Sequence, residues 1–415
     1  MAEREGCRAS EPERSGTPPR PTAGGGRRDA SSVSGSGTGA LPPEAYGAAL
    51  CTLAGMGPAR LTAVARAWPA LDEAWGHVCD GTAVRDPAVA AALGSFADTL
   101  PRVWARQARG LDPAAVLAAH HDAGIGVTVL GGVAYPEALA ADLEPAVVLF
   151  HRGRPDVVPG PRVAIVGTRT ASRYGRDVAW GLGRDLATAG VRVVSGLALG
   201  IDGAAHEGAL GAEAAPPLAV VGSGLDIVYP KRHAGLWRRV EEAGVVLSAA
   251  PPGAAPERWR LPARNRLGAA RADVVVVVES PRRGGSMHTV DAALEREVPV
   301  LAVPGPVTSP TSTGCNQLLA DSVAGVARDA GDVLSLLGLS SAAATRGAPD
   351  ARPSPTAEQA QVLDAFGWQP AALEQLAVRT GLGLGALAEA LQHLEAAGWV
   401  AADGGWFERV ARPDR

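Results

Sequence analysis

The segment Val163-Ala-Ile-Val-Gly-Thr-Arg169 leads four apolar residues directly into a glycine turn. Such a run is typical of a buried β-strand, and a helical pattern begins soon after it, around Arg173-Tyr-Gly-Arg176. A strand that ends in a glycine turn at a helix start directs backbone N–H groups and the positive end of the helix dipole toward one point. Because the only charged residues from 162 to 176 are four arginines, we expect this turn to bind phosphate.

The turn after this strand lacks the two common nucleotide-binding signatures. Its spacing is neither the Gly-x-Gly-x-x-Gly of a dinucleotide-binding turn nor that of a P-loop, which ends in Gly-Lys-Ser/Thr. An anion site without these signatures favours a nucleic-acid backbone over a bound nucleotide, so we expect no cofactor.

The composition indicates a multidomain protein whose basic residues are concentrated locally. A length of 415 residues favours two to four domains, and 47% apolar residues are ample for a sizeable core. The formal net charge is −4, so a nucleic-acid site has to be a local basic patch. Between residues 257 and 283 the chain has seven arginines against three acidic residues, which makes this stretch the best source of such a patch.

The cysteines and the apolar runs indicate the compartment. The four cysteines are scattered and form no Cys-x-x-Cys pair, which argues against a zinc site or a disulfide framework and fits a reducing cytosol. The chain starts with charged and then Gly/Ser/Pro-rich sequence, and no run approaches the roughly 20 apolar residues of a membrane span. We expect a cytoplasmic protein with no metal and no membrane partner.

Changes in composition and periodicity divide the chain into five segments. We expect, in order, a disordered tail, a helical module, an extended Rossmann-like domain, a linker and a winged-helix domain, at residues 1–40, 41–115, 116–337, 338–355 and 356–410. Inside the helical module, Leu53-Ala-Gly-Met-Gly-Pro-Ala-Arg-Leu61 resembles a helix-hairpin-helix. Such a hairpin either holds a DNA phosphate on its backbone amides or joins two helices without a ligand.

The central segment predicts an α/β fold with a mostly parallel sheet. Two apolar strands are expected at 125–130 and 146–150, and six further strands at 163–167, 191–195, 218–222, 245–248, 273–278 and 299–303. Near-continuous apolar strands that alternate with helices indicate a sheet covered on both faces. Ligands of such sheets lie at the carboxyl ends of the strands, near a topological switch point.

The last segment has the pattern of a winged helix. Helices are expected at 356–366, 371–379 and 384–397, followed by a hairpin at 399–407 that turns at an Asp-Gly pair. From 380 to 410 there are one basic and four acidic residues. This charge favours contact with a protein, or weak DNA binding, over binding of duplex DNA.

Glycine- and arginine-rich turns follow several of the predicted strands. We expect Asp202 to cap the helix after its strand, His206 to pack inside that helix and Glu279 to anchor an arginine in the pocket. No carboxylate pair and no nucleophile with a matching His and acid recur at the strand ends. We therefore expect a binding protein with no catalytic residues.

The order of the motifs resembles that of the DprA (Smf) family of DNA-processing proteins. The matching segments are Val166–Arg169, Ser195–His206, Gly222–Pro230, Arg264–Arg266 and Pro304-Gly305. The resemblance covers residues of about 41 to 410. It implies a non-catalytic, homodimeric protein that binds single-stranded DNA, protects incoming DNA during natural transformation and loads the RecA recombinase for homologous recombination.

The resemblance also implies which residues bind the DNA. By position they are Gly167, Thr168, Arg169, Lys231, Arg264, Asn265 and Arg266, and the charges beside them add Arg173 and Arg232. Thr168 stands where the family has Ser, and His233 where it has Asn. Aromatic residues make up only 4% of the chain, so base stacking is limited; Tyr229 and Trp259 are the candidates, and packing is the simpler role for each.

Two enzyme classes remain as alternatives. The first is a Rossmann-like nucleoside-monophosphate hydrolase of the lysine-decarboxylase-like family. Its Pro-Gly-Gly-x-Gly-Thr-x-x-Glu motif is approached only by Gly284-Gly-Ser-Met-His-Thr289, which lacks the Pro and the Glu spacing. The second, a dinucleotide-dependent oxidoreductase, lacks the glycine fingerprint and the ribose-binding acid.

Overall fold

The computed structural model of the chain describes residues 41–154, 160–212, 214–257, 260–339, 352–366 and 370–410. The expected tail at 1–40, most of the expected linker at 338–355 and Trp259 lie outside the described residues. Within these ranges, no helix combines the length and the hydrophobicity needed to cross a bilayer.

Six helices form the first part of the described chain. They are α1 (Pro43–Thr52), α2 (Pro58–Ala67), α3 (Leu71–Cys79), α4 (Pro87–Leu93), α5 (Leu100–Arg109) and α6 (Pro113–Asp122). Five of them begin at or next to a proline, where the missing N–H costs nothing. Trp104 is fully buried among them and donates its indole N–H to the carbonyl oxygen of Ala54, 2.8 Å away. This bond fastens α5 to the hairpin between α1 and α2.

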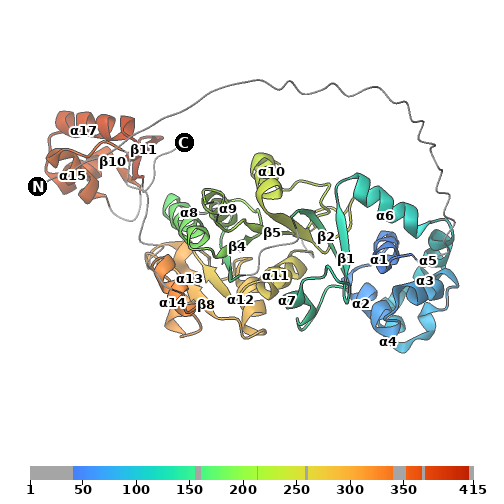
Figure 1. Cartoon of the computed structure of the whole chain (residues 1–415). Helices are drawn as coiled ribbons and strands as arrows, with labels where there is room; N and C mark the ends of the chain where they lie inside the picture. Colours follow the sequence, from blue (N-terminus) through green and yellow to red (C-terminus); the bar gives the residue numbers. More distant parts are fainter. Residues whose placement is uncertain are drawn as a thin grey trace, which may run out of the picture. The chain divides into compact units, whose positions relative to one another are not determined.

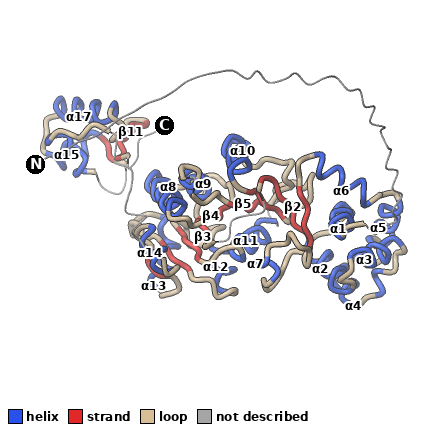
Figure 2. The backbone as a smooth tube through the Cα atoms, viewed as in Figure 1, coloured by secondary structure: helices blue, strands red, loops and turns tan. Residues whose placement is uncertain are grey.

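A nine-stranded sheet forms the centre of the fold (Figure 1, Figure 2). Its strands are β1 (Gly126–Val129), β2 (Val148–Gly153), β3 (Arg162–Val166), β4 (Arg192–Ser195), β5 (Leu218–Val221), β6 (Val245–Ser248), β7 (Val274–Val277), β8 (Val300–Ala302) and β9 (Gly325–Val326). They lie in the order β1-β2-β6-β5-β4-β3-β7-β8-β9, and pairing is parallel from β6 to β9. Only β1 and β2 are antiparallel to their neighbours. The predicted α/β fold class is confirmed.

Helices cover both faces of the sheet, as its apolar strands require. They are α7 (Glu137–Ala140), α8 (Arg173–Thr188), α9 (Ile201–Ala209), α10 (Ala234–Ala243), α11 (Arg260–Ala270), α12 (Met287–Leu294), α13 (Thr313–Ala320) and α14 (Ala330–Leu336). In β3, Val163 and Ile165 share a core with residues of α8, α9 and α14, while Ala164 and Val166 share another with residues of α11, α12 and α13. Alternate residues of one strand therefore bury into opposite faces.

The switch point of the sheet lies at β3. The chain runs from β3 through β4 and β5 to β6 on one side, and then returns to place β7 on the other side of β3. The turns after β3, β4 and β7 consequently open at one place on the carboxyl edge, where ligands of such sheets bind.

The C-terminal part has three helices and a small sheet. These are α15 (Ala357–Ala365), β10 (Ala371–Ala372), α16 (Leu373–Thr380), α17 (Leu384–Ala396), β11 (Val400–Asp403) and β12 (Trp406–Arg409). The prediction that this hairpin turns at Asp-Gly is wrong by one residue. Asp403 pairs with Trp406, so the turn is Gly404-Gly405, whose φ angles of 56° and 86° are those that glycine adopts without strain.

Helices α8 and α9 approach each other closely through glycines. A Cβ atom at Gly183 would collide with the carbonyl oxygen of Ala205, and one at Gly208 with the carbonyl oxygen of Trp180. Both obstacles are backbone atoms, which cannot rotate away. The start of α9 is joined to the turn after β3 by a bond from the Ile201 N–H to the Thr168 carbonyl oxygen, 3.3 Å long.

Gly183→Ala should therefore push the two helices apart. We expect it to lower the free energy of unfolding by about 1–3 kcal/mol, measured by urea denaturation. The matched control is Gly181→Ala on the same helix, where no atom lies within 4 Å of the added methyl group. It should raise stability by about 0.5–1 kcal/mol. Equal effects of the two variants would contradict the close approach.

Candidate functional site

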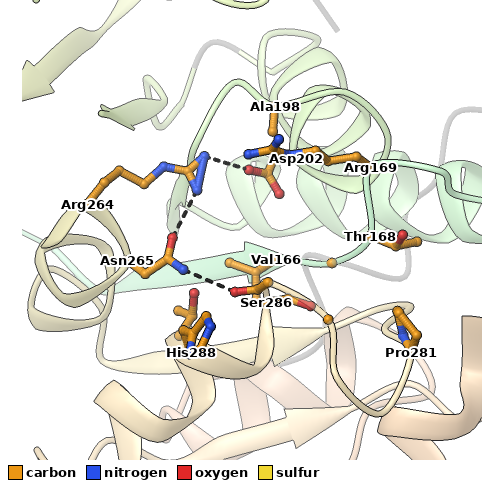
Figure 3. A pocket seen from close by; sticks show the side chains of 14 residues that line it. Val166, Thr168, Arg169, Ala198, Asp202, Arg264, Asn265, Pro281, Ser286 and His288 are labelled. Carbon is orange, nitrogen blue, oxygen red and sulfur yellow. Dashed lines mark hydrogen bonds and ion pairs between the residues drawn. The ribbon is translucent and has the colours of Figure 1, made fainter. Parts of the chain in front are cut away.

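A cavity of about 630 Å³ opens at the switch point (Figure 3). Its walls come from the turns after β3, β4 and β7 and from the first turns of α11. Five of the predicted site residues line it: Gly167, Thr168, Arg169, Arg264 and Asn265. Ala198, Ser286, His288 and Thr289 also line it and were not among the predicted site residues. They lie in two segments that the sequence singled out, Ser195–His206 and Gly284–Thr289.

The turn after β3 is held in place by its own backbone. A Cβ atom at Gly167 would lie 2.7 Å from the carbonyl oxygen of Glu279, so only glycine fits there. The N–H of Thr168 donates to that same oxygen at 2.7 Å. The N–H of Thr170 donates to the Thr168 hydroxyl at 3.3 Å. These two N–H groups therefore already donate to acceptors of the protein.

The start of α8 is likewise occupied by a carboxylate of the protein. The Ser172 N–H and hydroxyl donate to the Glu279 carboxylate at 2.9 and 2.7 Å, and the Thr311 hydroxyl donates to it at 3.3 Å. The prediction that Glu279 anchors an arginine is thus wrong. Its carboxylate is drawn instead to the positive end of a helix. An external anion therefore has to be bound by side chains or by the other turns.

Arg264 is the central side chain of the cavity wall. Its Nε donates to the Val220 carbonyl oxygen at 3.0 Å, and its Nη2 donates to the Gly196 carbonyl oxygen at 2.9 Å and to the Asp202 carboxylate at 3.1 Å. Its Nη1 donates to the Asn265 side chain at 3.1 Å (Figure 3). Four of its five N–H groups are therefore bound by the protein.

Asp202 does not cap α9, contrary to prediction. The N-cap is Gly200, with φ 81°, and Asp202 lies in the first turn with its side chain 6% exposed against Arg264. Burial raises the pKa of Asp202, an effect that the Arg264 charge opposes. Burial likewise lowers the pKa of Arg264, against the effect of Asp202. Each charge is tolerated there because the other compensates it.

Asn265 and Gly196 complete the frame around this ion pair. The Asn265 amide donates to the carbonyl oxygen of Gly285 at 3.1 Å, which ties α11 to the turn before α12. Any side chain at Gly196 would overlap the Arg264 guanidinium group. Arg264 and Asn265 thus cross-link the turns of the carboxyl edge.

Arg169 differs from Arg264 in being exposed and unpaired. Its side chain has no hydrogen bond or ion pair with any described residue, although it lies close enough to influence the pKa of both Asp202 and Arg264. Since Arg264 and Asp202 compensate each other, Arg169 supplies the net positive charge of this wall.

A second hollow adjoins the cavity and shares residues with it. Arg169, Ala198 and Arg264 line both, and the second hollow continues along Leu199 and Gly222 to Tyr229 and Pro230. The side chain of Tyr229 is 47% exposed there. We call this continuous surface, from Ser286 past Arg169 to Tyr229, the carboxyl-edge groove.

The other predicted site residues lie beside the groove or away from it. Lys231 and Arg232 are exposed in a short 3-10 turn directly after Pro230, at one end of the groove. Arg173 lies at the start of α8 and pairs with Asp177 at 4.0 Å. Arg266 pairs with Glu144 at 3.2 Å. Neither Arg173 nor Arg266 lines the cavity or the hollow.

Two histidines lie near the turn after β4. His233 Nδ1 is 2.9 Å from the carbonyl oxygen of Leu197, a residue with φ 54°, and so steadies the turn after β4. His206 is fully buried, as the prediction of a packing role requires. Burial lowers its pKa to about 4. Among the described residues, no group of three or more His, Cys, Asp and Glu side chains is arranged to hold a metal ion.

The buried His206 should make the fold sensitive to acid. Its pKa is near 6.5 when unfolded and about 4 when folded, so the unfolded chain binds the extra proton and stability falls as the pH drops through this window. The unfolding free energy of wild type should fall between pH 7 and pH 5. In His206→Gln this fall should be smaller by about 1–2 kcal/mol. Identical profiles for wild type and His206→Gln would contradict this assignment.

Family models match most of the described chain. The model of DNA recombination-mediator protein A matches residues 126–338, and the DprA winged helix domain matches residues 346–405. The solved structure of DNA processing protein A from Streptococcus pneumoniae is similar, with a TM-score of 0.59 and 28% identity, over 70% of this chain and 97% of that one.

Curated relatives agree with these matches. The putative DNA processing protein DprA of Mycobacterium tuberculosis is 41% identical over 257 residues, which are 61% of this chain and 66% of the relative. The alignment thus spans just under two thirds of that relative's length. Protein Smf of Escherichia coli is 33% identical over 290 residues, 67% of this chain and 75% of the relative. The chain therefore belongs to the DprA family, that of the DNA recombination-mediator protein A.

Proposed function

We propose that the chain binds single-stranded DNA along the carboxyl-edge groove and does no chemistry on it. The observation that carries this proposal is Arg169, an exposed and unpaired arginine that lines both halves of the groove. Lys231 and Arg232 add two exposed positive charges beside Pro230. Positive charges placed along a groove favour a chain of phosphates over a single small anion.

The shape of the groove supports a single strand as the ligand. A strand without its complement can lay its backbone along a groove bounded by loops and turn its bases outward. Tyr229 is exposed at the same end as Lys231, where its ring can stack on a base at a gain of about 1–3 kcal/mol. The structure therefore favours a stacking role for Tyr229 over the packing role that the sequence favoured.

The acids around the cavity support a binding role over a hydrolytic one. Asp202 is held by Arg264, and Glu279 is 2% exposed and held by Ser172 and Thr311. A nucleoside-monophosphate hydrolase needs a carboxylate within reach of its substrate, and both of these are committed to the protein. A non-catalytic binder requires no such group.

The proposal extends to the cellular role that the family resemblance implies. A cytoplasmic homodimer would protect incoming DNA during natural transformation and load RecA on it. Its test is the lag before RecA begins to hydrolyse ATP on single-stranded DNA that another binding protein already coats. We expect the full chain to shorten the lag at least severalfold, whereas an unchanged lag would contradict RecA loading and leave DNA binding untouched.

DNA binding is tested with labelled oligo-dT across a series of chloride concentrations. We expect affinity to fall steeply with salt, and Arg169→Ala to bind about tenfold less tightly with a salt slope smaller by about 0.7, because one phosphate contact is lost. Circular dichroism should show the variant folded, since Arg169 bonds to no other described residue.

Arg266→Ala is the matched control for this experiment. It removes the same charge from the surface but lies outside the groove, paired with Glu144. We expect it to bind oligo-dT as tightly as wild type. Equal weakening by both variants would show that only overall charge matters, and would contradict the groove assignment.

A further inference from the structure

Three arginines converge at the opposite, amino edge of the sheet. Arg162 and Arg192 begin β3 and β4 and are register partners in this parallel pair. Ala164 and Val194, two residues further along each strand, pack in the same core as Leu267 of α11. Because side chains alternate along a strand, both arginines point to the face that α11 covers.

Arg271 joins them from the end of α11. The helix ends at Ala270, so Arg271 lies where the chain turns back into β7. Arg192 is 5% exposed and Arg271 is 6% exposed. We call these three residues, Arg162, Arg192 and Arg271, the arginine cluster.

The cluster has too few partners for its charge. Asp273 is the carboxylate beside it, and it pairs with Arg162 at 3.3 Å while accepting the Arg162 backbone N–H at 2.7 Å. In the described part of the chain, neither Arg192 nor Arg271 has a side-chain hydrogen bond or ion pair. The Nε atoms of Arg162 and Arg271 are both buried without a hydrogen-bond partner. The nearby Tyr135 hydroxyl donates to the Ala146 carbonyl oxygen at 2.6 Å and does not add a charge.

Buried guanidinium groups without a counterion are unfavourable. Burial, followed by the positive charge of Arg162, lowers the pKa of Arg192 to about 10. Burial likewise lowers the pKa of Arg271 to about 10, and the positive charges of Arg162 and Arg192 both contribute. The carbonyl groups at the end of α11 offset only part of this charge, because a helix end provides about half a negative charge.

We propose that the arginine cluster is a binding site for a phosphate-type dianion. Three guanidinium groups and one carboxylate leave an excess of two positive charges, which a dianion neutralises. Guanidinium groups also match the oxygen geometry of phosphate with paired N–H donors, and the two unpartnered Nε atoms are such donors. The site lies at the other end of β3 from Gly167, so it is separate from the groove and does not depend on the proposed function.

The test is the thermal midpoint of the full chain in inorganic phosphate against chloride at equal ionic strength. We expect millimolar phosphate to raise the midpoint of wild type by about 2–4 °C. In Arg271→Met the phosphate effect should disappear, while the midpoint in chloride should equal or exceed that of wild type, because methionine replaces a buried charge. Arg192→Met should lose the phosphate effect in the same way. It replaces Arg271→Met in the test if that variant does not fold.

Arg169→Ala separates this site from the groove. It should keep the phosphate effect, since Arg169 lies at the opposite edge. A phosphate effect that is lost in Arg169→Ala and kept in Arg271→Met would overturn the proposal. So would a wild-type midpoint that neither inorganic phosphate nor the 5′-phosphate of an oligonucleotide raises.

The second source is the end of a nucleic-acid strand. Oligo-dT with a 5′-phosphate is compared with the same strand ending in a hydroxyl, in wild type and in Arg271→Met. An extra midpoint rise that needs both the 5′-phosphate and Arg271 would identify a strand end as the ligand, and a response to inorganic phosphate alone would identify the free ion.

Discussion

The buried ion pair between Arg264 and Asp202 is the interaction on which the carboxyl edge depends. It joins α9 to α11 across 62 positions of the chain, and Arg264 adds bonds to Val220 and to Gly196 in the turn after β4. Removing one partner would leave the other charged and buried, at a cost of about 3–5 kcal/mol. Glycine at position 196 is needed because the guanidinium group occupies the space of a side chain there.

Arg264 and Arg169 have different surroundings, which the sequence alone does not distinguish. Arg264 is occupied by protein acceptors and holds the turns at fixed positions. Arg169 has no such partner and is presented to solvent by the turn after β3, which the backbone bond from Thr168 to Glu279 holds in place. An anion that contacts Arg169 would not have to break the ion pair between Arg264 and Asp202. The groove would therefore keep its shape on binding, and such preorganisation favours affinity.

The elements of the fold could be predicted because their signals are local. Apolar runs such as Val274–Val277 are buried on both faces, and their composition alone predicts a strand. The partners of Asp202 and Glu279 could not be predicted in this way. Asp202 has the residue type of a cap, yet Gly200, with a φ of 81° that suits glycine, is the residue before α9, and the Asp202 carboxylate pairs with Arg264. Such pairs depend on which loops the completed sheet brings together, which no window of sequence contains.

Counting charges along the chain was misleading for the same reason. The arginines between 257 and 283 suggested one basic patch, but the fold distributes them. Arg264 faces the cavity, Arg266 pairs with Glu144, and Arg271 lies at the amino edge with Arg162 and Arg192. A five-residue strand such as β3 spans roughly 16 Å, so Arg162 and Arg169 at its two ends do not contact one small ligand together. The fold of this acidic protein thus separates its arginines onto the two opposite edges of one sheet.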